Sequence, residues 1–318
     1  MFPHRDISQQ KEAKIAYVFP GQGSQIVGMG RDLYERSPAA RAIFEEADAS
    51  LGFPLSRLCF EGPEEELRQT VCAQPAIVTV SSAYLRALSE ERGQLTLTPI
   101  FVAGHSLGEY TALAAAGALT FSDTVRLARE RGRLMQEAGE RTPGGMAAII
   151  GLDEETVEEV CRETGAKIAN LNSSQQIVVS GTREALAWAM DLARTRGARQ
   201  ITPLQVSGAF HSPLMEPAAE GLANALAKFA FRDPQIPLIA NGTARPVTTA
   251  DKLQEELLWQ LCHCVQWQRS VQYMVDAGVA TFIEIGPGRV LSGLIRRINK
   301  DVQVFDVDNM DSFPGVIS

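Results

Sequence analysis

A serine framed by two glycines, where an apolar run meets helix-forming sequence, constrains this chain more than any other feature. Residues 99–103 read Pro-Ile-Phe-Val-Ala, which is typical of a buried strand, and residues 104–108 read Gly-His-Ser-Leu-Gly. Strand, turn and helix in this order are typical of a nucleophile elbow, whose tight turn requires glycine on both sides of the serine. The following helix points its free N–H groups and its positive dipole end toward the serine oxygen. The pattern predicts that Ser106 is a covalent nucleophile.

The rest of the chain alternates strand-like and helix-like segments, and this order predicts an α/β fold. Residues 143–207 follow the order strand, helix, strand, strand, helix, strand, which is the ferredoxin-like arrangement. We therefore expect a large hydrolase-like α/β domain with a parallel sheet, formed by residues 1–142 and 208–318. Residues 143–207 are expected to form an inserted ferredoxin-like subdomain, and the tail from Asn309 onward is expected to be loose.

Charge and composition exclude several classes of function. The net charge is −8 and no basic stripe is present, which argues against binding to nucleic acid. No apolar run approaches the ~20 residues that span a bilayer, and the polar N-terminal segment has no signal-like region, so we expect a cytoplasmic protein that does not bind membranes. The five cysteines are scattered, which favours reduced thiols. Residues 262–264 read Cys-His-Cys but lack a second ligand pair, so no metal site is expected.

A serine hydroxyl needs a base to take its proton, and histidine is the usual base near neutral pH. The chain has only four histidines. His4 lies in a polar N-terminal segment, His263 lies between two cysteines, and His105 precedes the nucleophile, so its side chain should point away from Ser106. His211 remains, in a loop that leaves a strand and enters a helix, where α/β enzymes carry catalytic groups. Acidic residues between positions 106 and 211 leave a conventional triad possible.

Six separated blocks of the sequence together resemble one known family. The chain resembles the malonyl-CoA:acyl carrier protein transacylases, which belong to the acyltransferase family of fatty-acid and polyketide synthesis. The resemblance covers nearly the whole chain. It rests on Phe-Pro-Gly-Gln-Gly-Ser-Gln at 19–25, Gly-His-Ser-Leu-Gly-Glu-Tyr at 104–110, Arg-Gly-Arg-Leu-Met-Gln at 131–136, Gly-Ala-Phe-His at 208–211, Val-Gln-Trp at 265–267 and Glu-Ile-Gly-Pro-Gly at 284–288.

The resemblance implies a mechanism for the serine and the histidine. Ser106 would attack the thioester of malonyl-CoA, with His211 as general base and then as general acid. The main-chain carbonyl of Gln266 would orient the histidine, where many serine hydrolases use a carboxylate. The main-chain N–H groups of Leu107 and Gln22 would form the oxyanion hole.

The resemblance also implies how the acyl group is selected. Arg131 would form a bidentate pair with the free carboxylate of the malonyl group. An acyl chain without a carboxylate would leave this charge buried and unpaired, and would be rejected. Phe210 matches the malonyl-type members, because its ring should crowd an α-methyl branch. Asn172 lies in a stretch that lines the cleft of the family, which implies a binding role.

These residues imply a ping-pong reaction with two partners, malonyl-CoA and an acyl carrier protein. The phosphopantetheine thiol belongs to the carrier, so no cofactor or metal is expected on this chain, which we expect to act as a monomer. Arg296 and Arg297 place positive charge on one helix of an acidic protein. Because carrier proteins are typically acidic, this helix is a candidate docking surface.

Two other interpretations remain open. The chain could be the acyltransferase of a trans-acting polyketide synthase or of a malonate decarboxylase. It could also be a serine thioesterase or esterase, although a hydrolase for neutral acyl chains has no use for a buried arginine at position 131. Transfer of the acyl group to a thiol, compared with attack by water, would separate these interpretations.

Overall fold

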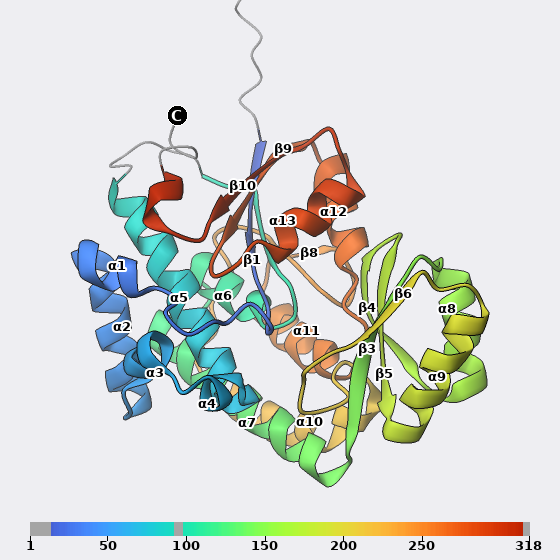
Figure 1. Ribbon diagram of the computed structural model, residues 1–318. Coiled ribbons are helices and arrows are strands. Elements are labelled where there is room, and N and C mark those ends of the chain that lie inside the picture. The colour runs from blue at the N-terminus through green and yellow to red at the C-terminus, as the bar shows by residue number, and fades with distance from the viewer. Residues whose placement is uncertain (1–13, 92–97, 314–318) are drawn as a thin grey trace, which may run out of the picture.

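Two sheets of different kinds organise the computed structural model, which describes residues 14–91 and 98–313 (Figure 1). His4 lies outside the described residues. The larger sheet has the strand order β10-β9-β1-β2-β7-β8, with parallel neighbours except for the antiparallel edge pair β7 and β8. Its strands are β1 (Lys14–Phe19), β2 (Phe101–Gly104), β7 (Leu238–Ile239), β8 (Pro246–Val247), β9 (Val279–Ile285) and β10 (Gln303–Val307).

Helices cover both faces of this sheet, because the side chains of β1 alternate between two cores. Ile15 and Phe19 pack into the core that contains α5 and α7, whereas Ala16 and Val18 pack into the core of α12 and α13. The helices outside the smaller subdomain are α1 (Arg31–Arg36), α2 (Pro38–Leu51), α3 (Leu55–Glu61), α4 (Glu64–Arg68), α5 (Thr70–Glu91), α6 (Gly108–Ala115), α7 (Phe121–Arg141), η2 (Pro213–Met215), α10 (Glu216–Leu226), α11 (Ala250–Cys262), α12 (Trp267–Asp276), α13 (Val290–Ile298) and η3 (Met310–Ser312).

The smaller sheet is antiparallel and has the strand order β4-β5-β3-β6. This is the order of a ferredoxin-like sheet, and all of its strands lie between residues 143 and 207. Helices α8 and α9 pack on its outer face (Figure 1) around a separate apolar core. The α/β class expected from the sequence is confirmed. The elements are β3 (Gly144–Ile150), α8 (Glu154–Thr164), β4 (Lys167–Ser173), β5 (Gln176–Thr182), α9 (Arg183–Thr195) and β6 (Gln200–Pro203).

Main-chain hydrogen bonds join the smaller sheet to a loop of the larger domain. Leu171 N donates to Val265 O at 2.9 Å, and Val265 N donates to Ala169 O at 2.8 Å. Strand β4 is thereby fixed beside the loop that connects α11 and α12. Residues of β4 can therefore form one wall of a cleft whose other wall belongs to the larger sheet.

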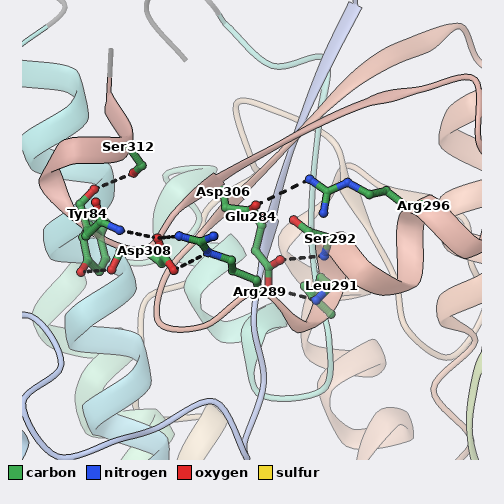
Figure 2. Close-up of polar contacts among 10 residues, drawn as sticks. Tyr84, Glu284, Arg289, Leu291, Ser292, Arg296, Asp306, Asp308 and Ser312 are labelled. Atoms are coloured by element: carbon green, nitrogen blue, oxygen red, sulfur yellow. Dashed lines mark hydrogen bonds and ion pairs between the residues drawn. The ribbon is translucent and has the colours of Figure 1, made fainter. Parts of the chain in front are cut away.

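Residues 309–313 pack against the body of the protein, so the expectation of a loose tail from Asn309 is wrong over that stretch. Phe313 is fully buried, and Met310 N donates to the Asp32 carboxylate at 3.1 Å. Figure 2 shows two further ties: the Tyr84 hydroxyl donates to Asp308 O at 2.5 Å, and Arg289 Nε lies 2.8 Å from Asp308 Oδ2. A buried aromatic ring and these polar contacts offset the entropy of ordering the segment.

The described residues contain no helix that is both long and apolar enough to cross a bilayer.

The elbow turn is packed against the end of β1 so closely that only glycine fits. A Cβ at Gly108 would lie 2.0 Å from Phe19 O, and a Cβ at Gly104 would lie 1.9 Å from the carbonyl carbon of Gly108. Ser106 itself adopts the left-handed conformation, with φ 51°. The two glycines therefore let β1, β2 and α6 meet at the serine.

We expect Gly108→Ala to lower the free energy of unfolding by about 3 kcal/mol, because the added methyl group overlaps main-chain atoms of β1. Urea unfolding measures the change. Gly293→Ala is the control, since a Cβ at this position of α13 meets no atom within 4 Å, and we expect a change of less than ~1 kcal/mol there. Equal effects of the two substitutions would contradict the close packing at the elbow.

Candidate active site

The fold brings Ser106 and His211 into contact although 105 positions separate them in the sequence. Ser106 lies between β2 and α6, and His211 lies between β6 and η2. The Ser106 Oγ lies 2.7 Å from His211 Nε2. Both residues have positive φ, 51° and 57°. Such strained backbone is typical of residues whose side chains must be held at a functional site.

The histidine is oriented by a main-chain carbonyl, but the carbonyl is that of Gln260 and not that of Gln266. His211 Nδ1 donates to Gln260 O at 2.8 Å. Gln260 lies in the last turn of α11, where carbonyl groups have no partner within the helix. Gln266 instead begins α12, and its main-chain N–H donates to Asn241 O at 2.8 Å. The expectation for Gln266, which came from the resemblance, is therefore wrong, because the end of α11 and not the start of α12 faces the histidine.

The contact with Gln260 fixes the state of the imidazole. With its proton on Nδ1, the ring presents the Nε2 lone pair to the Ser106 hydroxyl. Burial, and after it the positive charge of Arg131, lowers the pKa of His211 to about 3. His211 is thus a neutral base at neutral pH. Within the described part of the chain, no carboxylate is bonded to His211, so the conventional triad is not formed there.

Arg131 is buried next to the serine without a carboxylate partner among the described residues. Its side chain comes from α7 and is 1% exposed. Nη1 donates to Gln74 Oε1 at 3.0 Å, and Nη2 donates to Gln260 Oε1 at 2.8 Å and to Ser106 Oγ at 3.1 Å. Its Nε has no hydrogen-bond partner among residues 14–91 and 98–313. All of these acceptors are neutral oxygens, so the guanidinium keeps an uncompensated charge beside the serine.

Glycine allows α7 to bring Arg131 this far into the interior. A Cβ at Gly132 would lie 2.5 Å from Thr70 O, at the start of α5. The two helices therefore approach each other closely beside the arginine. The Tyr110 ring also lies below the guanidinium, with 5.1 Å from Cζ to the ring centroid.

Four polar residues of the site were not identified from the sequence: Gln74, Glu109, Asn241 and Gln260. Asn241 holds the elbow, since its Oδ1 accepts from Ser106 N and its Nδ2 donates to Gly104 O, each at 2.7 Å. Its place directly after β7 is a usable signal, because the carboxyl ends of parallel strands carry functional residues. Glu109 lies within the block at 104–110 but draws no attention, since a glutamate in the first turn of a helix is usually solvated.

The predicted oxyanion donors lie on either side of the serine. Leu107 immediately follows Ser106, and Gln22 lies in the turn after β1. Neither main-chain N–H donates to an acceptor among the described residues. The Gln22 side chain donates to Thr70 Oγ1 at 3.2 Å, which anchors the turn. The oxyanion role of these two groups stays a prediction.

A cleft of about 220 Å³ lies between the two sheets beside this site. Gln22 and His105 line one wall and Asn172, from β4, lines the other. His105 Nε2 and Asn172 Oδ1 are 2.8 Å apart, so this pair joins the two walls. Asn172 therefore lies at the cleft, although its oxygen is already used. Phe210 is buried in the large core immediately before His211, and its effect on branched acyl groups stays a prediction.

The two arginines expected to dock a carrier protein differ in their surroundings. Both lie on the last turn of α13. Arg296 donates to Val304 O at 2.8 Å and lies 3.6 Å from Asp306 Oδ2 (Figure 2), so part of its charge is compensated within the protein. Arg297 is exposed. Docking at this helix stays a prediction.

An elbow serine hydrogen-bonded to a histidine, in an α/β fold with an inserted ferredoxin-like sheet, has the geometry found in enzymes that use a nucleophilic serine. Comparison with known proteins narrows the class. Residues 16–312 match the model of the acyl transferase domain, so the chain belongs to that family. The resemblance noted from the sequence is confirmed.

The relatives agree with one another in name. The chain is 46% identical to the malonyl CoA-acyl carrier protein transacylase of Bacillus subtilis (strain 168), over 94% of this chain and 95% of that protein. It is 43% identical to the protein of the same name from Escherichia coli (strain K12), over 90% and 93%. The acyl-carrier-protein-S-malonyltransferase of Bartonella henselae superposes with a TM-score of 0.92 at 43% identity, over 96% and 98% of the two chains.

We expect Arg131→Ala to raise the pKa of His211 by roughly one to three pH units, because the substitution removes a nearby positive charge and admits water. NMR titration of the His211 ring protons measures the pKa. Arg133→Ala is the control, since Arg133 lies on the same helix but is exposed and paired with Glu130 and Glu137. An unchanged pKa in the Arg131 variant would show that burial alone depresses it.

Proposed function

We propose that this protein transfers a malonyl group from malonyl-CoA to the phosphopantetheine thiol of an acyl carrier protein, for fatty-acid or polyketide synthesis. The observation that carries the proposal is the buried Arg131, which lies 3.1 Å from the Ser106 oxygen and has no carboxylate partner in the described residues. The names of the relatives support it. So does a solved complex of a type II PKS acyl-carrier protein with its malonyl-transacylase, to which this chain is 39% identical with a TM-score of 0.92, over 96% of this chain and 99% of that one.

The first half-reaction forms a malonyl ester on Ser106. His211 Nε2 takes the hydroxyl proton while the serine oxygen attacks the thioester carbon. The carbonyl oxygen becomes an oxyanion, which the N–H groups of Leu107 and Gln22 would stabilise. The C–S bond then breaks, and the departing thiolate takes the proton from His211. The Gln260 carbonyl keeps the ring in the required tautomer throughout.

In this scheme, the substrate carboxylate binds Arg131 and also makes His211 a stronger base. A carboxylate on the free face of the Arg131 guanidinium pairs with the charge that lacks a partner. Pairing removes the second cause of the low pKa of His211, which is the field of Arg131. The base therefore becomes stronger when malonyl-CoA is bound than when the site is empty. An acetyl group lacks the carboxylate and leaves both the charge and the weak base unchanged.

The second half-reaction reverses the first, with the carrier thiol in place of the thiol of CoA. His211 takes the thiol proton, the sulfur attacks the malonyl ester, and the Ser106 oxygen recovers its proton. The chain's own side chains supply all of this chemistry, and we propose that it uses no resident cofactor or metal. A cytoplasmic location and a monomeric state stay predictions from the sequence.

We expect intact-mass analysis to show one malonyl group on the protein after mixing with malonyl-CoA, and none on Ser106→Ala. Ser89→Ala is the control, because Ser89 is an exposed serine at the end of α5. Adding a carrier protein that bears phosphopantetheine should discharge the label onto the carrier faster than water releases it as malonate. A malonyl label that persists on Ser106→Ala would exclude Ser106 as the nucleophile. Release of the malonyl group to water alone would favour a thioesterase.

We expect Arg131→Ala to lower kcat/KM for malonyl-CoA by at least ~30-fold, since a buried charge-assisted pair is lost. Acylation by acetyl-CoA should change far less, because acetyl makes no such pair. The kcat/KM of Arg131→Lys for malonyl-CoA should lie between those of the parent and Arg131→Ala, because an ammonium keeps the charge but not the planar pair of donors. An unchanged ratio of malonyl to acetyl acylation in both variants would remove Arg131 from acyl selection.

A further inference from the structure

The carboxyl group of Glu109 is fully buried behind the active site and has no part in the mechanism above. It belongs to the first turn of α6, three residues after the nucleophile. Its Oε1 accepts from Asn241 N at 3.1 Å, and its Oε2 accepts from Gln260 Nε2. Both partners also bond the main chain of Ser106. Glu109 is thus in contact with two of the residues that hold the site together.

The amide of Gln260 links Glu109 to the arginine. Its Nε2 donates to Glu109 Oε2 and to Ser106 O, the latter at 3.0 Å, and its Oε1 accepts from Arg131 Nη2 at 2.8 Å. An amide has two donors on nitrogen and acceptor capacity only on oxygen. Both donors are used on the side of Glu109, which leaves the oxygen for Arg131. Gln260 is fully buried, so water offers no alternative partner.

An ionised Glu109 favours the same orientation of this amide as the Ser106 carbonyl and Arg131 do, and so adds to the contacts that place the oxygen against the arginine. An ionised carboxylate only accepts hydrogen bonds, so it requires the amide nitrogen on its side. If the amide were reversed, its N–H groups would meet the N–H groups of Arg131, and its oxygen would meet the Ser106 carbonyl. Each reversed contact would leave a buried polar group unsatisfied.

Glu109 performs this task without direct contact with Arg131, whose positive charge it stabilises only across the Gln260 amide. No hydrogen bond or ion pair joins the two side chains in the described structure, so the guanidinium stays open to an anion. Burial, and after it the charge of Glu256, raises the pKa of Glu109 well above its usual range. Glu256 lies on α11, and its Oε1 accepts from Gly242 N at 2.6 Å. The carboxyl pair therefore titrates together.

We propose that Glu109 is a specificity-positioning residue, which orients the Gln260 amide so that its oxygen holds Arg131 ready for the malonyl carboxylate. The proposal rests on malonyl transfer as the function of the site. Glu109 affects the choice of acyl group through Gln260 and Arg131, and it does not touch the acyl group itself.

The test compares Glu109→Gln with the matched control Glu256→Gln. Glutamine at 109 has almost the same shape but carries a donor and an acceptor, so one of its two contacts must become donor against donor in either orientation. Glutamine at 256 can still offer its oxygen to Gly242 N. Intact-mass rates of serine acylation with malonyl-CoA and with acetyl-CoA are measured for each protein, together with circular dichroism as a check of folding.

We expect Glu109→Gln to lower the ratio of malonyl to acetyl acylation by at least roughly tenfold, through a higher KM for malonyl-CoA, while the acetyl rate stays near that of the parent. Glu256→Gln should keep the parent ratio at neutral pH. A folded Glu109→Gln protein with the parent ratio would overturn the proposal. Absence of malonyl labelling on the parent protein would instead overturn the proposed function.

The pH dependence of the same ratio provides a second test that does not require the Glu109 variant to fold. The charged groups that face Glu109 are Glu256 from α11 and Arg131 from α7, with His211 beyond the Gln260 carbonyl. A protonated Glu109 no longer requires the N–H of Gln260 as a hydrogen-bond donor. The ratio of malonyl to acetyl acylation by the parent protein should therefore fall as the pH is lowered. The ratio is taken from kcat/KM, which reports the pKa of His211 in the free enzyme, so the titration of His211 is the same for both substrates and cancels.

The variant Glu256→Gln shows whether the fall in the ratio comes from titration of Glu109 or from titration of the substrate carboxylate. It removes the repulsion that raises the pKa of Glu109, so the fall in the ratio should move to lower pH. Titration of the malonyl carboxylate itself would give the same midpoint in both proteins. Equal midpoints would therefore overturn the proposal, whether or not Glu109→Gln folds.

Discussion

The uncompensated charge of Arg131 is the constraint on which the rest of the site depends. A guanidinium taken out of water needs partners, and here the partners in the described residues are neutral amide and hydroxyl oxygens. The Gln260 carbonyl orients His211 without adding a negative charge, so Arg131 keeps its affinity for an anion.

The same charge ties substrate choice to base strength. An empty site combines a cation with a histidine whose pKa is about 3, lowered first by burial and then by Arg131. A substrate that supplies a carboxylate relieves the second effect, and a substrate without one does not. Selection of the acyl group and activation of the serine are thus consequences of one electrostatic arrangement. The buried carboxyl group of Glu109 contributes by orienting the neutral amide of Gln260, and it leaves the guanidinium available to an anion.

Much of the fold and part of the site could be predicted from local sequence. The elbow glycines, the apolar run before them and the strand–helix order of residues 143–207 are short-range signals, and each one is present in the structure. The orienting carbonyl was misplaced by six residues, because the resemblance pointed to Gln266 and only the packing of α11 against the histidine shows that the Gln260 carbonyl faces it. Glu109 and Asn241 were missed for a similar reason. Their types are common in solvated turns, and only burial against other elements makes their hydrogen bonds functional.

The sequence by itself determined the residue types that carry the chemistry, because an elbow serine, a loop histidine and an arginine beside a glycine each need a local pattern that can be read along the chain. Only the tertiary structure decided which carbonyl orients His211, which oxygens face Arg131 and that the tail folds back to bury Phe313. The physical reason is that burial and hydrogen-bond partners come from segments distant in sequence. An arginine in a helix is a solvated side chain until the fold removes its water and withholds its counter-ion.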